Sequence, residues 1–236
     1  VLYGTNDYAI PASELGAEVG GNARDLFAGA LVLGNTHHVQ PAKMIAGLAN
    51  LARKHGAMIC ERTEVTGLQS CREGTRVKTN GGDIIAQDVL LTTGGYTKEF
   101  AAFLWNRTLG VPSIVAASEE LPREGVAEMF PTGRVLLVNR VRGFSCRPSP
   151  DGSRMLLAGP LAQTPRSPEA DVRALKDYFK RLFPEVASME FTHCWTGMIA
   201  ATRDAQGQPD GTAHTALGRH SCCGRQEVSP LAIARQ

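Results

Sequence analysis

Two adjacent glycines at the end of a short apolar run are the feature of this sequence best suited to binding chemistry. Residues 89–92 (VLLT) are followed directly by Thr93, Gly94 and Gly95. A β-branched and leucine-rich run that stops at paired glycines is typical of a buried parallel strand entering a tight turn. Glycine permits positive φ and lets a ligand approach the main chain. Because open α/β sheets bind ligands beyond the carboxyl ends of their strands, this turn is the predicted nucleotide contact.

Other residue types that could perform chemistry lack a recognisable partner. None of the six cysteines forms a Cys-x-x-Cys pair, so we expect reduced thiols in a cytoplasmic protein rather than a disulfide framework. His214, His220, Cys222 and Cys223 gather near the C-terminal end, but their spacing matches no usual zinc pattern, and no metal site is predicted. No histidine has the spacing of a general base and no nucleophile has a partner, so the catalytic residues stay unknown.

Composition excludes several classes of function. A formal net charge of +2 without a basic stripe argues against a nucleic-acid partner. No apolar stretch reaches membrane-spanning length, so no membrane span is expected. The remaining partner class is a small molecule, and the oligomeric state stays unknown. Because the first residue is Val1 rather than Met, we expect a fragment, a processed product or a partial reading frame.

The elements around the glycine turn can be predicted from pattern. Before it, we expect a short helix after Pro11 and a strand at 28–33. A helix is expected from Pro41 to a stop at Gly56, followed by a buried strand at 57–60. Short strands are expected at 65–68, 75–79 and 84–86, with residues 80–82 (NGG) as a strong hairpin signal.

The middle of the chain has a different pattern, in which short apolar segments alternate with proline and glycine. Short strands separated by proline and glycine are predicted at 111–118, 134–138, 143–147 and 154–157. A turn is expected at 148–152, and a helix with an apolar stripe is expected over 168–183. This arrangement predicts an antiparallel sheet with a helix.

Residues 35–97 resemble the FAD-dependent oxidoreductases of the D-amino-acid oxidase (DAO) family, which include glycine, sarcosine and gamma-glutamylputrescine oxidases. The matching order is His38 and Pro41, a helix ending at Gly56, a segment around Val65, the small meander, and the strand entering the glycine turn. The resemblance implies non-covalent FAD, with contacts at Val65, Thr93, Gly94 and Gly95.

The fold class implied is α/β (α+β), with an incomplete FAD/NAD(P)-binding Rossmann-like domain and an antiparallel β substrate-binding domain that carries a helix. Four divisions are expected. Residues 1–34 form a partial segment, 35–97 the central part of the FAD-binding domain, and 98–195 the substrate-binding domain. Residues 196–236 return to the FAD-binding domain and end in an aberrant tail.

A third landmark lies at Trp195, Gly197 and Ile199. In the family a similar Trp-x-Gly segment crosses from the substrate domain toward the flavin, which implies substrate contacts at Trp195 and Ile199; a core aromatic at a domain junction is the equally weighted interpretation of Trp195. The α-amino-acid oxidases carry an arginine where Ile199 stands, so its absence argues against a small free amino acid as substrate. The sarcosine-type enzymes bond flavin through a cysteine where Gly197 stands.

Two departures from the family pattern leave two functions open. No Gly-x-Gly-x-x-Gly motif is present, and residues 219–226 break a pattern that begins at 216–218. We therefore expect that the N-terminal nucleotide unit is missing and that the last residues are read out of frame or degenerated.

The first function is FAD-dependent oxidation of an amine or amino-acid-derived substrate at a carbon–nitrogen bond. The alternative is a non-catalytic truncated remnant that binds no flavin. An NAD(P)-dependent enzyme is a weak third, because the glycine fingerprint is absent.

Overall fold

The computed structural model describes residues 6–34, 37–138, 143–160, 167–202, 213–215, 218–222 and 231–234. The chain divides into two compact units. Unit 1 comprises residues 1–39, 112–197 and 228–236, and unit 2 comprises residues 40–111 and 198–227. The chain passes between the units inside two long strands, β7 (Thr108–Ser118) and β11 (Phe191–Thr202).

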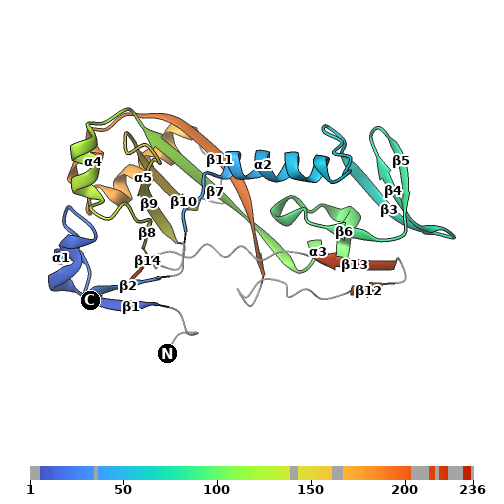
Figure 1. Ribbon diagram of the computed structural model, residues 1–236, viewed down its shortest axis with the longest axis horizontal. Helices are drawn as coiled ribbons and strands as arrows, with labels where there is room; N and C mark the ends of the chain where they lie inside the picture. The colour runs from blue at the N-terminus through green and yellow to red at the C-terminus, as the bar shows by residue number, and fades with distance from the viewer. Residues whose placement is uncertain are drawn as a thin grey trace. The chain divides into compact units, whose positions relative to one another are not determined.

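A mixed sheet of eight strands, β1-β2-β14-β8-β9-β10-β7-β11, forms the framework of unit 1 (Figure 1). Its other strands are β1 (Tyr8–Pro11), β2 (Gly29–Val32), β14 (Leu231–Ala234), β8 (Leu136–Val138), β9 (Phe144–Pro148) and β10 (Met155–Pro160). The pairs β8–β9, β9–β10 and β10–β7 are antiparallel, which confirms the predicted antiparallel arrangement of the middle region. Strand β14 pairs in parallel with β8 and antiparallel to β2.

Helix α5 (Pro168–Phe179) packs on this sheet and contacts β10 (Figure 1). The Ser167 side chain caps its first turn by accepting a hydrogen bond from the Ala170 amide at 3.3 Å. Its inward stripe includes Leu175 and Phe179, which are buried. The helix ends four residues before the predicted stop at 183, because the chain tightens there: the Leu182 amide bonds the Phe179 carbonyl at 2.9 Å in an i→i+3 turn.

The core of unit 1 gathers side chains from the sheet and from short helices on it. The short helices are η1 (Ala12–Ala17), α1 (Ala23–Leu26), α4 (Arg123–Met129) and η4 (Pro184–Ala187). The largest fully buried side chains are Phe179, Phe183, Leu15, Ile114, Leu136, Met155 and Leu157. The predicted helix after Pro11 and the predicted strand at 28–33 are confirmed by η1 and β2.

Unit 2 contains helix α2 and a three-stranded meander. Helix α2 (Pro41–Lys54) starts with proline as predicted, and the Gln40 side chain caps it by accepting from the Lys43 amide at 2.7 Å. The meander consists of β3 (Val65–Cys71), β4 (Gly74–Thr79) and β5 (Gly82–Ala86), paired antiparallel in the order β3-β4-β5 (Figure 1). The predicted hairpin is confirmed, since Thr79 pairs with Gly82 across the two-residue loop and Gly82 has φ +129°.

The strand before the glycine turn lies in a second small sheet of unit 2. Strand β6 (Val89–Leu91) pairs in parallel with β13 (Gly218–Cys222), and β13 pairs antiparallel with β12 (Ala213–Thr215). The parallel pairing is confirmed, but Leu90 is 57% exposed rather than buried as expected. Within the segment expected to break the family pattern, residues 220–222 pair with β6 and Arg219 pairs with His214 of β12. Residues 223–230 lie outside the described part of the chain.

The predicted buried strand at 57–60 is wrong. Residues 57–60 have no strand assignment, and Met58 is 88% exposed. A strand needs a neighbour that completes its hydrogen bonds, and no strand of the described chain pairs with this segment. An apolar run alone therefore does not decide the conformation here.

Helix α2 has no buried residue, although its apolar side chains fall at helical spacing. Met44, Ile45, Leu48 and Leu51 are all between 48% and 64% exposed. This unit therefore carries a contiguous amphipathic face that its described residues do not cover. Within the described residues, no helix is both long and apolar enough to cross a membrane.

Candidate functional site

The glycine turn after β6 is a compact, internally bonded structure. Gly94 has φ +52°, and the short helix η2 (Gly94–Tyr96) follows at once. The carbonyl of Gly94 accepts hydrogen bonds from both the amide and the hydroxyl of Thr97, at 3.2 and 2.8 Å. The Thr97 hydroxyl also lies 2.6 Å from that of Thr93. Because these bonds hold the loop from within, its outer main chain is fixed before any ligand arrives.

The two glycines of this turn have different surroundings. A Cβ at Gly94 would meet nothing within 4 Å, so the backbone there is open to a ligand. A Cβ at Gly95 would lie 2.8 Å from the Met198 carbonyl oxygen and 2.9 Å from the Met198 Cβ. The Met198 amide also donates to the Tyr96 hydroxyl at 3.2 Å. Gly94 thus has the geometry of a contact residue, whereas Gly95 is required for packing against β11.

Val65, the other predicted contact, begins strand β3 close to this turn. An ion pair between Glu64 and Lys98 joins the residue before Val65 to the segment after the turn. The hydrogen bond from Lys98 holds the pKa of the Glu64 carboxyl below its ordinary value, and the charge of Lys98 acts in the same direction. Both side chains are exposed, so the pair contributes little stability. It shows that the residue before Val65 lies next to the segment that follows the glycine turn.

Trp195 and Ile199 both lie on β11. Trp195 is 50% exposed and Ile199 is 41% exposed, so neither is a buried core residue of its own unit. Both interpretations of Trp195, a substrate contact and a core aromatic at a domain junction, stay predictions. The boundary between the two units falls between Gly197 and Met198, so Trp195 belongs to unit 1 and Ile199 to unit 2.

Comparison with known proteins identifies the family. Residues 3–224 match the model of the DAO family, described as FAD dependent oxidoreductase. The chain belongs to this family. It is 28% identical over 173 residues to the Rhizobium meliloti protein "Probable oxidoreductase OrdL", covering 72% of this chain and 39% of the relative. A Haemophilus influenzae protein of the same name is 26% identical over 183 residues, covering 75% of this chain and 41% of the relative.

Solved structures show the same fold. Glycine oxidase from Geobacillus kaustophilus is similar with a TM-score of 0.70 at 18% identity, over 93% of this chain and 58% of that one. L-proline dehydrogenase from P. horikoshii is similar with a TM-score of 0.71 at 17% identity, over 93% and 59%. These likenesses confirm the predicted fold class. The chain spans about two fifths of the length of the sequence relatives named above.

Two histidines of this DAO-family chain, His38 and His193, lie within hydrogen-bond distance of neighbouring groups in unit 1. His38 Nε2 accepts a hydrogen bond from the Val135 amide at 3.1 Å, which ties the chain before α2 to the start of β8. Partial desolvation lowers the pKa of His38, and the positive charge of Arg147 lowers it further. His193 lies on β11, with Nδ1 2.9 Å from the Thr192 hydroxyl.

No metal-binding group was found in the part of the chain that the structure describes. The side chains of His214, His220, Cys222 and Cys223 lie outside that part. Burial raises the pKa of the Cys146 thiol well above its ordinary value, so this thiol is unreactive. Cys60, Cys71, Cys146 and Cys194 are all free.

Sequence reasoning located the glycine turn but missed the residues that shape it. Thr97 is 4% exposed and makes three of the bonds described above, yet no pattern marked it. Its position three residues after Gly94 is the only available signal, because a threonine there can bond back to the turn. The contact of Met198 with Gly95 joins distant parts of the chain, and no local pattern predicts it.

Proposed function

We propose that this chain contributes to the FAD-dependent oxidation of an amine or amino-acid-derived substrate at a carbon–nitrogen bond. The single observation that carries the proposal is the open backbone at Gly94, on a turn already bonded from within. The DAO family membership supplies the cofactor class. The structural neighbours are a glycine oxidase and an L-proline dehydrogenase, and their activities support amine chemistry here.

The residues at the turn fit part of a dinucleotide site. At Gly94 positive φ and free space combine, so a phosphate or ribose oxygen could approach the main chain where a Cβ would obstruct it. Val65, whose side chain is partly exposed at the start of β3, would supply the second contact. Thr93 would keep its hydroxyl on Thr97 and its carbonyl on the Tyr96 amide, and its own amide would serve the ligand. Gly95 would act through its packing on Met198.

When bound, FAD supplies the redox chemistry by accepting a hydride equivalent from the carbon beside the amine nitrogen. The protein's part is binding and orientation. We assign substrate contact to Trp195 and Ile199, whose side chains on β11 are both exposed enough to reach a ligand. Since Ile199 cannot clamp a carboxylate as an arginine would, the preferred substrate is an amine or a derivatised amino acid. We also propose that the protein is cytoplasmic, that residues 35–97 are the central part of the FAD-binding domain, and that residues 98–195 are the substrate-binding domain.

Flavin titration of the 236-residue chain tests the cofactor site. We expect Gly94→Ala to weaken FAD binding by roughly tenfold or more, the loss of one hydrogen bond to a charged group. Gly56→Ala is the matched control, because Gly56 also has positive φ and open space but lies at the end of α2. The measurement is quenching of flavin fluorescence. Equal affinity in the two variants would remove the turn from the site.

A graft tests substrate choice. Replacing the corresponding strand of a glycine-oxidising relative with residues 193–199 of this chain should abolish turnover of glycine, because the carboxylate clamp is lost. A second graft with Ile199→Arg should restore it. Retained turnover in the first graft would refute the assignment of Ile199.

The alternative, a remnant that binds no flavin, rests on a specific observation. Helix α2 leaves its whole apolar stripe exposed, and the sequence has no Gly-x-Gly-x-x-Gly cradle. Losing several contacts to a pyrophosphate would cost roughly 1.5–3 kcal/mol each, enough to prevent binding. If the chain is this remnant, it should purify colourless and produce no peroxide from an amine. A yellow, monodisperse preparation that oxidises an amine would favour the enzyme over the remnant.

A further inference from the structure

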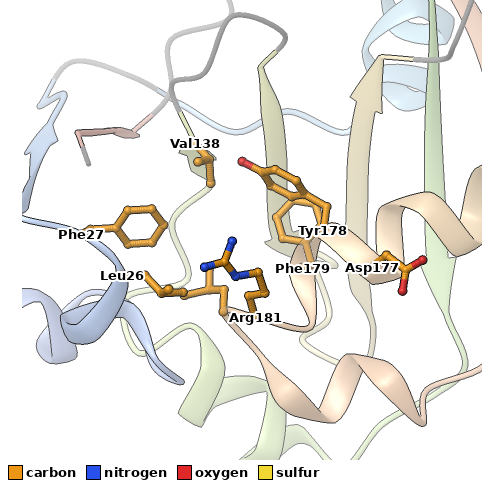
Figure 2. A pocket seen from close by; sticks show the side chains of 8 residues that line it. Leu26, Phe27, Val138, Asp177, Tyr178, Phe179 and Arg181 are labelled. Carbon is orange, nitrogen blue, oxygen red and sulfur yellow. The ribbon is translucent and has the colours of Figure 1, made fainter. Parts of the chain in front are cut away.

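A small cavity inside unit 1 is used by none of the functions proposed above. It has a volume of about 200 Å³ and lies where α1 meets the end of α5, next to β8 (Figure 2). Its apolar lining is Leu26, Phe27, Val138, Phe179 and Leu182. Four of these five side chains are less than 7% exposed, so the cavity has a fixed floor.

A single cation faces this apolar space. Figure 2 shows the guanidinium of Arg181 reaching between Phe27 and the ring of Tyr178. Among the described residues, no carboxylate lies within ion-pair distance of Arg181. Asp177 also lines the cavity, but it pairs with Lys180 at 2.7 Å and points away from the guanidinium in Figure 2. Because arginine stays charged at every accessible pH, this position favours an anion.

The main chain beside the guanidinium is anchored. The Asn22 side chain donates to the Arg181 carbonyl at 3.1 Å, and the Asn22 amide donates to the Leu182 carbonyl at 2.8 Å. These bonds fix the backbone of both residues and occupy carbonyl oxygens that would otherwise repel an anion. The mouth of the cavity is therefore held in place without a ligand, which lowers the entropy cost of binding.

Size and wall chemistry define the ligand class. A cavity of about 150 Å³ lined by aliphatic and aromatic side chains admits benzene, whereas drug-sized ligands need at least roughly 300 Å³. Tyr178 stacks on Phe144 at 3.8 Å between ring centroids and meets Phe179 edge-on at 5.1 Å, which gives an aromatic wall. We propose that this cavity binds a small monocarboxylate with a single aromatic ring, the ring on the apolar floor and the carboxylate on Arg181.

Fluorine NMR with 4-fluorophenylacetate tests this site on the 236-residue chain, without added flavin. We expect saturable broadening of the probe signal, and affinity at least roughly tenfold lower for the neutral 4-fluorophenylacetamide, because only the acid can make the charge-assisted bonds. Equal binding of the acid and the amide, or no binding of the acid, would overturn the proposal. This comparison needs no variant and does not depend on the flavin site.

Two substitutions locate the bound probe. Arg181→Gln should lower affinity for the acid by roughly tenfold and leave that for the amide unchanged. Arg173→Gln is the matched control, since Arg173 lies on α5 outside this cavity and should not alter binding. Leu26→Trp should fill the space and abolish binding of both probes. Acid binding that survives Arg181→Gln, or that Arg173→Gln removes, would show that the probe binds elsewhere and refute the site.

Discussion

Gly95 and Gly110 both approach Met198, but through different atoms, and this difference makes a sharp prediction. A Cβ at Gly95 would meet three atoms of Met198 that cannot move independently, namely the carbonyl oxygen, the carbonyl carbon and the Cβ, at 2.8 to 2.9 Å. A Cβ at Gly110 would clash with the terminal Cε of the same side chain alone, at 2.7 Å, and would make an ordinary contact with the Gly95 carbonyl oxygen at 3.6 Å. The first clash requires strand β11 to shift, whereas the second requires one side-chain rotation.

The expected cost follows from these atoms. Overpacking against fixed atoms costs about 1–3 kcal/mol, and removing a glycine from the unfolded chain returns about 0.4–1 kcal/mol. We expect Gly95→Ala to lower the free energy of unfolding by about 1–2 kcal/mol. Gly110→Ala should change it by less than about 0.5 kcal/mol, because a methionine side chain has three rotatable bonds and adapts.

Urea denaturation followed by tryptophan fluorescence and far-UV circular dichroism measures both costs. With a urea dependence of about 2 kcal/mol per molar, Gly95→Ala should lower the midpoint by roughly 0.5–1 M. Adding Met198→Ala should not rescue Gly95→Ala, since alanine keeps all three clashing atoms. A Gly110→Ala variant as unstable as Gly95→Ala, or a rescue by Met198→Ala, would refute the described packing of β11.

Three further outcomes follow from burial and charge. Ile45→Lys on the exposed face of α2 should change the free energy of unfolding by less than about 0.5 kcal/mol, whereas Leu175→Lys on α5 should prevent folding; urea curves for both decide this. His38 should titrate below its ordinary value of 6.5 by NMR, and because its neutral form is favoured in the folded state, stability should fall as pH drops below 6.5 toward the folded pKa. Hydrogen bonds from neighbouring serines lower the pKa of Asp151 to about 2, so Ser153→Ala should raise it measurably toward 3.8 in an NMR titration.

Local patterns predicted most elements because their signals are contained within a few residues. The hairpin at 80–82 and the helix starting at Pro41 depend on turn chemistry and a capping position, and both were confirmed. The stop of α5 was missed by four residues, because the i→i+3 bond that tightens the chain leaves no clear mark in the sequence. Boundaries depend on such small differences in backbone geometry.

Burial could not be predicted from the same patterns. The apolar run at 57–60 predicted a buried strand, yet Met58 is 88% exposed. The apolar residues of α2 fall at helical spacing, yet Leu48 is 50% exposed. An apolar stripe indicates that burying its side chains would lower the free energy of the folded protein. It does not indicate which other element buries them. Burial is a property of the partner surface as much as of the element, and no local window contains the partner.

The glycine turn also combines a feature that the sequence predicts with one that it does not. Sequence reasoning treated Gly94 and Gly95 alike, because both lack a Cβ and both follow the strand. The structure separates them: Gly94 has positive φ and open space, while Gly95 has neither, and its hydrogen faces Met198. Gly94 leaves the backbone accessible to a ligand, and Gly95 allows the turn to pack against Met198. A ligand assay on the two alanine variants should therefore single out Gly94→Ala as the weaker binder. A stability assay should show a loss in both variants, from the positive φ at Gly94 and from the clash with Met198 at Gly95.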